Sequence, residues 1–206
     1  SAEAAITVMA RIEDDLCTVS VDTSGALLHK RGHKEAVSKA PMRETMAAMF
    51  LKQCGFVGEE PVVDPMCGSG TFIIEAAEIA AGMQPGRSRA FAFEQLATFD
   101  APTWKRMREQ ACAAWFQTPS FKFYGSDRDA GAVSMSRANA ERAGVAELTD
   151  FHQHAISELN RPEGPAGLVI VNPPYGARLG ESSHLKPLYS ALGRTLLDRF
   201  KGWRVG

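Results

Sequence analysis

Four consecutive residues in the last fifth of the chain, Asn172-Pro173-Pro174-Tyr175, are suited to bind a planar amino group. They follow an apolar run at 168–171 that predicts a buried parallel strand, so they would lie beyond its carboxyl end, where open α/β sheets bind ligands. The two prolines fix φ and lack N–H donors, which leaves stiff carbonyl acceptors. With the Asn172 side-chain oxygen, these carbonyls can accept both hydrogens of an exocyclic NH2 group, while Tyr175 stacks on its base. The motif favours catalysis of group transfer to an exocyclic amine, although an ordinary turn with a packed aromatic ring has the same composition.

A glycine-containing segment lies between a predicted strand at 61–63 and a helix-like run at 72–81. Its two glycines allow a tight turn and a close approach to a ligand, and the start of the next helix offers unpaired N–H groups to a carboxylate. The spacing is not that of a dinucleotide site, and no Lys-Ser or Lys-Thr pair follows, so phosphate binding is disfavoured. A tight turn before a helix is the alternative. The segment is Asp64-Pro65-Met66-Cys67-Gly68-Ser69-Gly70-Thr71.

An acidic residue ends the next predicted strand. Residues 121–125 alternate like a strand and lead through Ser126 to Asp127, ahead of a helical stretch at 130–143. In nucleotide-binding α/β folds, an acid at this place binds the two hydroxyls of a ribose. We therefore predict that Asp127 is a ribose ligand. The alternative is a helix cap, supplied by Asp127 or by Asp129.

These motifs, taken together, resemble those of a known enzyme family. The chain is similar to the S-adenosylmethionine-dependent guanine-N2 RNA methyltransferases that carry a THUMP domain, in particular those acting on large-subunit ribosomal RNA. Similar Asn-Pro-Pro-Tyr motifs occur in adenine-N6 DNA methyltransferases. The likeness is carried by the segments 22–25, 28–33, 40–45, 64–71, 123–127 and 172–178, the last ending at Arg178.

The resemblance implies a fold, a cofactor and a set of site residues. The fold would be a Rossmann-like class I methyltransferase with a doubly wound, mostly parallel sheet and a short N-terminal β/α appendage, and the cofactor S-adenosylmethionine. At Ala155 this chain departs from relatives that carry an acid there, so backbone groups near His154 and Ala155 would take its place. The catalytic residues implied are Asn172, Pro173, Pro174 and Tyr175. The cofactor residues implied are Asp64, Pro65, Cys67, Gly68, Ser69, Gly70, Thr71, Asp127, Arg128, His154, Ala155 and Asn172.

The function expected from the resemblance is methylation of guanine N2 in ribosomal RNA. One alternative is adenine-N6 methylation of DNA, which has the same amino-group chemistry. An alternative of another class is a non-catalytic RNA-binding scaffold that kept the fold. The formal net charge of −1 argues against a strongly basic nucleic-acid binder. A local cluster of basic residues weakens this argument, because it could contact phosphate groups, although it could equally be a solvated loop. The cluster comprises Lys30, Arg31, His33, Lys34, Lys39 and Arg43.

The remaining composition indicates a reduced, cytoplasmic protein. The four cysteines, at 17, 54, 67 and 112, show no Cys-x-x-Cys spacing, and we expect no metal ion. No apolar run reaches the roughly 18–20 residues that a membrane span needs. Cys67 lies inside the glycine segment, which favours a small residue packed beside the cofactor over a catalytic nucleophile.

The predicted organisation is a short N-terminal segment followed by a catalytic domain. Residues 1–40 would form a hairpin, at 6–20, and a linker. Residues 41–206 would form the methyltransferase domain, with an insertion at about 82–120 that accounts for the 63 residues between Asp64 and Asp127. Helices are expected at 43–54, 102–116 and 185–200. A strand begins at 202–206, so we expect the last strands of the fold to be absent from the chain.

Overall fold

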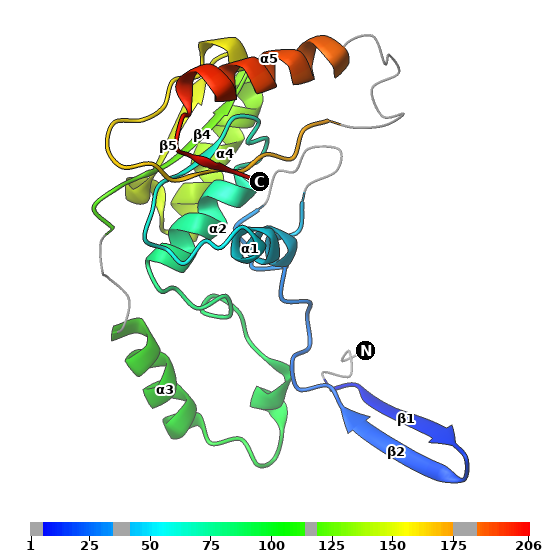
Figure 1. The fold of residues 1–206 in the computed structure, drawn as a ribbon. Coiled ribbons are helices and arrows are strands. Elements are labelled where there is room, and N and C mark those ends of the chain that lie inside the picture. Colours follow the sequence, from blue (N-terminus) through cyan, green and yellow to red (C-terminus); the bar gives the residue numbers. More distant parts are fainter. Residues whose placement is uncertain (1–5, 35–41, 114–118, 175–184) are drawn as a thin grey trace. The chain divides into compact units, whose positions relative to one another are not determined.

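The computed structural model describes residues 6–34, 42–113, 119–174 and 185–206 (Figure 1). The chain divides into two compact units. The first comprises Ser1–Gly32 and Met83–Trp115, and the second comprises His33–Gly82 and Phe116–Gly206. The domain boundary predicted at residue 40 lies outside the described residues.

A five-stranded parallel sheet forms the centre of the second unit. Its strands lie in the order β5-β4-β3-β6-β7, so the chain builds outward from β3 to β5 and then returns to the other side of β3. This reversal places a topological switch point between β3 and β6, where open α/β sheets bind ligands. The doubly wound parallel sheet predicted from the sequence is confirmed. Its strands are β3 (Val62–Asp64), β4 (Phe123–Asp127), β5 (Thr149–Gln153), β6 (Leu168–Val169) and β7 (Arg204–Val205).

Helices α2 (Thr71–Ala80), α4 (Ala130–Ala143) and α5 (Leu185–Arg199) pack against this sheet, and α1 (Glu44–Gln53) packs against α2. Helix α2 contacts β3 and β4, while α4 contacts β4 and β5 (Figure 1). In the turn after α5, Phe200 and Trp203 pack with Val63 and Val169 of the sheet. The core is thus built from β-branched and aromatic strand residues covered by apolar helix faces.

The ends of α4 follow the expected local chemistry. Asp129 caps its amino end, because the Asp129 side chain accepts a hydrogen bond of 2.8 Å from the Gly131 N–H. Gly144 ends the helix with φ near +75°, a conformation that glycine adopts without strain. Of the two caps that the sequence allowed, Asp129 takes this role, which leaves Asp127 for another.

The first unit contains a hairpin and a short helical segment. Strands β1 (Val8–Glu13) and β2 (Leu16–Val21) pair antiparallel around Asp14 and Asp15, both with positive φ, as a two-residue hairpin turn requires. The hairpin predicted at 6–20 is therefore present. The inserted residues form η1 (Ala92–Gln95) and α3 (Ala101–Ala113) around a cluster of aromatic rings comprising Phe91, Phe93, Phe99 and Trp104.

Candidate active site

A cavity of about 470 Å³ lies at the carboxyl ends of β3 and β4 in the second unit. Most of the residues predicted from the sequence to bind a cofactor line it. Gly70 and Pro173 are described but do not line the cavity, and Tyr175 lies outside the described residues. The predicted residues in the lining are Asp64, Pro65, Cys67, Gly68, Ser69, Thr71, Asp127, Arg128, His154, Ala155, Asn172 and Pro174. Sequence reasoning did not assign the others, Met42, Met66, Phe72, Ile156, Leu185 and Leu188.

Asp64 ends β3 and is only 2% exposed. Its Oδ1 accepts a hydrogen bond of 3.0 Å from the Met66 N–H, which fixes the turn into the glycine segment. Burial raises the pKa of Asp64 to about 7, with a smaller contribution from the neighbouring Asp127, because removal from water disfavours the charged form. The carboxyl is therefore close to half ionised at neutral pH and would bind a cationic group more readily than a neutral one.

The glycine segment 66–70, called the cofactor loop below, turns sharply into α2. Gly68 and Gly70 have φ of +54° and +79°. A Cβ at Gly70 would lie 3.0 Å from the Cβ of Ser136, so the loop could not lie this close to α4 with a larger residue. Gly70 is the N-cap of α2 and supplies no side-chain cap, so the first N–H groups of α2 have no side-chain partner there.

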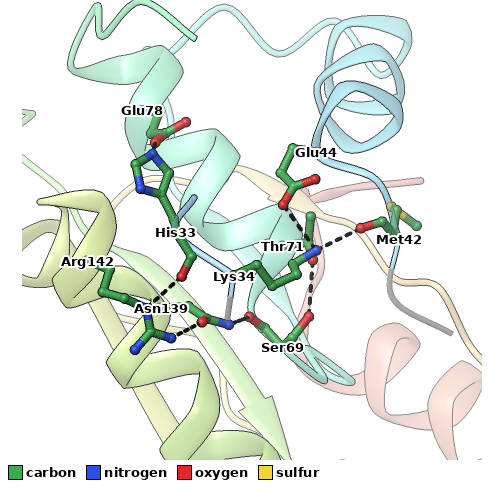
Figure 2. Close-up of polar contacts among 9 residues, drawn as sticks. All are labelled: His33, Lys34, Met42, Glu44, Ser69, Thr71, Glu78, Asn139 and Arg142. Carbon is green, nitrogen blue, oxygen red and sulfur yellow. Dashed lines mark hydrogen bonds and ion pairs between the residues drawn. The ribbon is translucent and has the colours of Figure 1, made fainter. Parts of the chain in front are cut away.

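Two buried polar side chains of α4 hold the carbonyls of the cofactor loop. The Ser136 hydroxyl donates to the Gly68 carbonyl at 2.9 Å, and Asn139 Nδ2 donates to the Ser69 carbonyl at 3.0 Å (Figure 2 shows the second contact). Sequence reasoning missed both residues. Their spacing of three positions on one helix face was the only signal available.

Asp127 is bonded to the cofactor loop. Its Oδ2 accepts a hydrogen bond of 3.1 Å from the Gly68 N–H, and its Oδ1 accepts one of 3.0 Å from the Asp129 N–H. These bonds orient the carboxylate at the cavity wall. A carboxylate fixed in this way can accept further hydrogen bonds from the hydroxyls of a ligand.

Cys67 lines the cavity as a buried thiol. Burial, followed by the charge of Asp64, raises the pKa of the Cys67 thiol above its ordinary value, so the thiol stays protonated at neutral pH. A protonated thiol is a poor nucleophile. The structure thus supports a packing role for Cys67, as the sequence suggested.

His154 and Ala155 follow β5 and form another part of the wall. The His154 N–H donates to the Asp127 carbonyl at 3.2 Å, and the Ala155 N–H donates to the Glu158 carboxylate at 3.1 Å. Burial, with the nearby His152, lowers the pKa of His154, which favours the neutral imidazole. Both N–H groups therefore already have acceptors, and the apolar residue Ile156 also lines the cavity.

The predicted catalytic motif begins at the same cavity. Asn172 and Pro174 both line the cavity. The Tyr189 hydroxyl of α5 donates to the Pro174 carbonyl at 3.1 Å, so one acceptor of the motif is already engaged. Arg178, like Tyr175, lies outside the described residues.

Two residues of the predicted basic cluster are committed to intramolecular contacts (Figure 2). Lys34 donates to the Met42 carbonyl at 2.8 Å and lies 3.5 Å from Glu44, and its side chain is only 11% exposed. His33 lies 3.6 Å from Glu78, with its side chain 13% exposed. For these two residues, both interpretations of the cluster, a solvated loop and a phosphate contact, are wrong.

The described residues contain neither a membrane-spanning helix nor a cluster of metal-binding side chains. Over 6–34, 42–113, 119–174 and 185–206, no helix combines the length and the apolar character needed to cross a membrane. Within the same ranges, no group of three or more His, Cys, Asp or Glu side chains could hold a metal ion.

Comparison with known proteins relates the chain to methyltransferases. Residues 31–206 match the family model described as RMKL-like, methyltransferase domain. The ribosomal RNA large subunit methyltransferase K/L of Vibrio campbellii is 40% identical over 205 residues, which cover 97% of this chain and 29% of the relative. The chain therefore spans less than a third of that relative's length.

Two solved structures share both the fold and the sequence pattern. SMU.472, solved in complex with SAH, is 33% identical with a TM-score of 0.85, and the match covers 96% of this chain and 51% of that one. A protein of Listeria monocytogenes, designated a predicted N6-adenine-specific DNA methylase, is 34% identical with a TM-score of 0.86, covering 96% and 52%. The chain spans about half the length of each.

Proposed function

Because the chain belongs to the RMKL-like methyltransferase domain family, we propose that it contains the catalytic domain of an S-adenosylmethionine-dependent methyltransferase acting on guanine N2 of ribosomal RNA in the cytoplasm. Residues 41–206 would form this domain, with the insertion at about 82–120, after the hairpin and linker of 1–40. The name of the Vibrio relative supports the ribosomal RNA substrate. The single observation that carries the proposal is the cavity of about 470 Å³ that the cofactor loop, Asp127 and Asn172 share.

The residues around the cavity fit the parts of S-adenosylmethionine. The fixed Asp127 carboxylate can accept hydrogen bonds from the ribose hydroxyls, and the uncapped start of α2 can receive the ligand's carboxylate. Asp64, whose pKa is raised to about 7, can bind a cationic group of the cofactor when its carboxyl is ionised. The wall at His154, Ala155 and Ile156 can take the adenine ring. When bound, the cofactor supplies an electrophilic methyl group on a sulfonium.

The substrate amine would be oriented by two acceptors. The resemblance assigns the two amine hydrogens to the Asn172 side-chain oxygen and the Pro173 carbonyl, while the Pro174 carbonyl accepts from Tyr189. Binding both hydrogens favours a tetrahedral nitrogen whose lone pair is directed at the methyl group. After transfer, the methylated nitrogen would release one of its two protons to solvent. Such positioning can contribute up to about 7–11 kcal/mol, and the same oxygens stabilise the positive charge that develops on the nitrogen. Tyr175 would stack on the extruded base.

The test separates binding from chemistry. In Asn172→Ala we expect kcat to fall by at least about 100-fold, while the Kd for S-adenosylmethionine stays within about threefold of wild type, because the side chain acts on the amine. Asn160→Ala, at an exposed asparagine outside the cavity lining, is the matched control and should leave both values unchanged. An equal loss of binding and turnover in Asn172→Ala would instead indicate a structural role.

The DNA alternative is kept because of a specific relative. The Listeria protein carries the designation of a DNA adenine methylase. Mass spectrometry of nucleosides, after RNA and DNA are incubated with the protein and labelled cofactor, decides between the substrates. We expect N2-methylguanosine in RNA. N6-methyladenine in DNA with unmodified RNA guanine would overturn the substrate assignment, and no labelled nucleoside at all would favour the scaffold.

A further inference from the structure

Helix α4 presents a row of polar side chains, Ser136, Asn139 and Arg142, spaced three positions apart on one face. Ser136 is 0% and Asn139 1% exposed. Burying polar groups is costly unless hydrogen bonds replace those lost to water, so the partners of these groups matter for the fold. The partners lie in two segments far apart in the sequence.

A continuous chain of hydrogen bonds runs from residue 33 to the cofactor loop (Figure 2). The Arg142 Nε donates to the His33 carbonyl at 2.7 Å, and Arg142 Nη2 donates to Asn139 Oδ1. Asn139 Nδ2 then donates to the Ser69 carbonyl at 3.0 Å. The amide orientation is required by both partners, because its oxygen faces a guanidinium donor and its nitrogen faces a carbonyl.

Lys34, near the start of the second unit, makes a second set of contacts with residues close to the cavity. Lys34 donates to the Met42 carbonyl at 2.8 Å and pairs with Glu44, and Met42 itself lines the cavity. Residues 33–34 thus connect to the cofactor site in two ways, through α4 to Ser69 and through Lys34 to Met42.

The bonds to the loop carbonyls fix the shape of the cofactor loop. A peptide unit is planar and trans, so holding a carbonyl also fixes the direction of the N–H group bonded to the same carbon. Ser136 and Asn139 bind the successive carbonyls of Gly68 and Ser69, which fixes the orientation of the two peptide planes that contain these carbonyls. The loop then meets a ligand without having to reorganise.

We propose that Asn139 and Arg142 are positioning residues that couple the anchoring of residues 33–34 to the geometry of the cofactor loop at Ser69. The coupling rests on the proposed function, in that the loop binds S-adenosylmethionine. Coupling between two sites is reciprocal. Cofactor binding therefore steadies residues 33–34, and loosening these residues weakens cofactor binding.

Two substitutions separate the two halves of the hydrogen-bond chain. Asn139→Asp keeps an acceptor for Arg142 but loses the donor to the Ser69 carbonyl. Arg142→Met breaks the bonds to the His33 carbonyl and to Asn139 Oδ1 but keeps the Asn139 donor that faces the Ser69 carbonyl. Glu141→Gln, at an exposed neighbouring position of α4, is the matched control.

The measurements are calorimetric binding of SAH and hydrogen exchange of the free and SAH-bound protein. In wild type, SAH should slow exchange in peptides covering 66–71 and 33–34. Asn139→Asp should raise the Kd by about tenfold, the size of one lost buried hydrogen bond, and should reduce both effects on exchange. Arg142→Met should retain the slowing at 66–71 and lose it at 33–34, which a purely stabilising role would not do. The control should match wild type.

The outcomes distinguish this proposal from the one on which it rests. Wild type that binds no SAH would overturn the proposed function, and the coupling with it. Wild type that binds SAH, together with an Arg142→Met protein that keeps the full slowing at 33–34, would overturn the coupling alone. If Asn139→Asp does not fold, Arg142→Met alone still tests the coupling. Arg142 is exposed, so its replacement should not prevent folding.

Discussion

Replacing Asp64 with asparagine should stabilise the free protein while weakening cofactor binding. Asp64 is 2% exposed, and burial raises its pKa from 3.8 to about 7. Since the folded state holds the proton more tightly than the unfolded chain, stability is lost as the pH rises from about 4 to about 7. At 1.36 kcal/mol per pH unit, the ionised carboxyl costs the folded state about 4 kcal/mol at most above pH 7. Asparagine carries no such cost and keeps the oxygen that accepts from the Met66 N–H.

The assay is urea denaturation of wild type and Asp64→Asn at pH 5 and pH 8. The stability advantage of the variant should grow by about 2–3 kcal/mol between these pH values, because most of the titration of Asp64 in the folded protein falls between pH 5 and pH 8. Glu147→Gln, at an exposed carboxyl, is the control and should show no such growth. The Kd for S-adenosylmethionine at pH 8 should rise in Asp64→Asn, since the variant lacks the charge that would bind the cationic part of the cofactor. An advantage that is the same at both pH values would refute the raised pKa.

Two further predictions concern Asp127, the proposed ribose-binding residue, and a partly buried ion pair of the second unit, Lys34 with Glu44. Asp127→Ala should weaken S-adenosylmethionine binding by at least about 1 kcal/mol, the low end for a lost charged hydrogen-bond partner, and calorimetry on a folded variant that shows unchanged affinity would exclude the ribose role. A double-mutant cycle on Lys34 and Glu44, at 11% and 15% side-chain exposure, should give a coupling energy above about 1 kcal/mol in denaturation experiments. The same cycle on Lys105 and Glu109, at 78% and 66%, should give less than about 0.5 kcal/mol; equal couplings would show that burial does not set the strength.

The positions of β3 and β6 were predictable because each is a short apolar run followed by chemically distinctive residues. Val62 and Leu168 lie in such runs, and both are fully buried in the parallel sheet. The grouping of the insertion with the hairpin was not predictable. It depends on contacts such as the Phe93 N–H donating to the Thr23 carbonyl, which join positions 70 residues apart and leave no local pattern.

The site was predictable where the chemistry lies in consecutive residues, and less so where it depends on distant partners. The lining of the cavity by Asp64, Asp127 and Asn172 agrees with the expectation from their motifs. Lys34 looked like a surface charge, because nothing in its neighbourhood in sequence shows that Glu44 and the Met42 carbonyl surround it. Burial overrides the expectation from composition at such positions.

The buried polar residues of α4 show why the cofactor loop needs more than its glycines. Glycine allows the positive φ at Gly68 and Gly70, but it also leaves the unfolded loop with many accessible conformations. Ser136 and Asn139 select among these conformations by bonding two successive loop carbonyls. In the sequence they are polar positions of a helix, and only their spacing of three positions sets them apart from solvent-facing ones. The glycines supply the freedom to turn and α4 supplies the restraint, so a shape suited to the cofactor requires residues nearly 70 positions apart to act together.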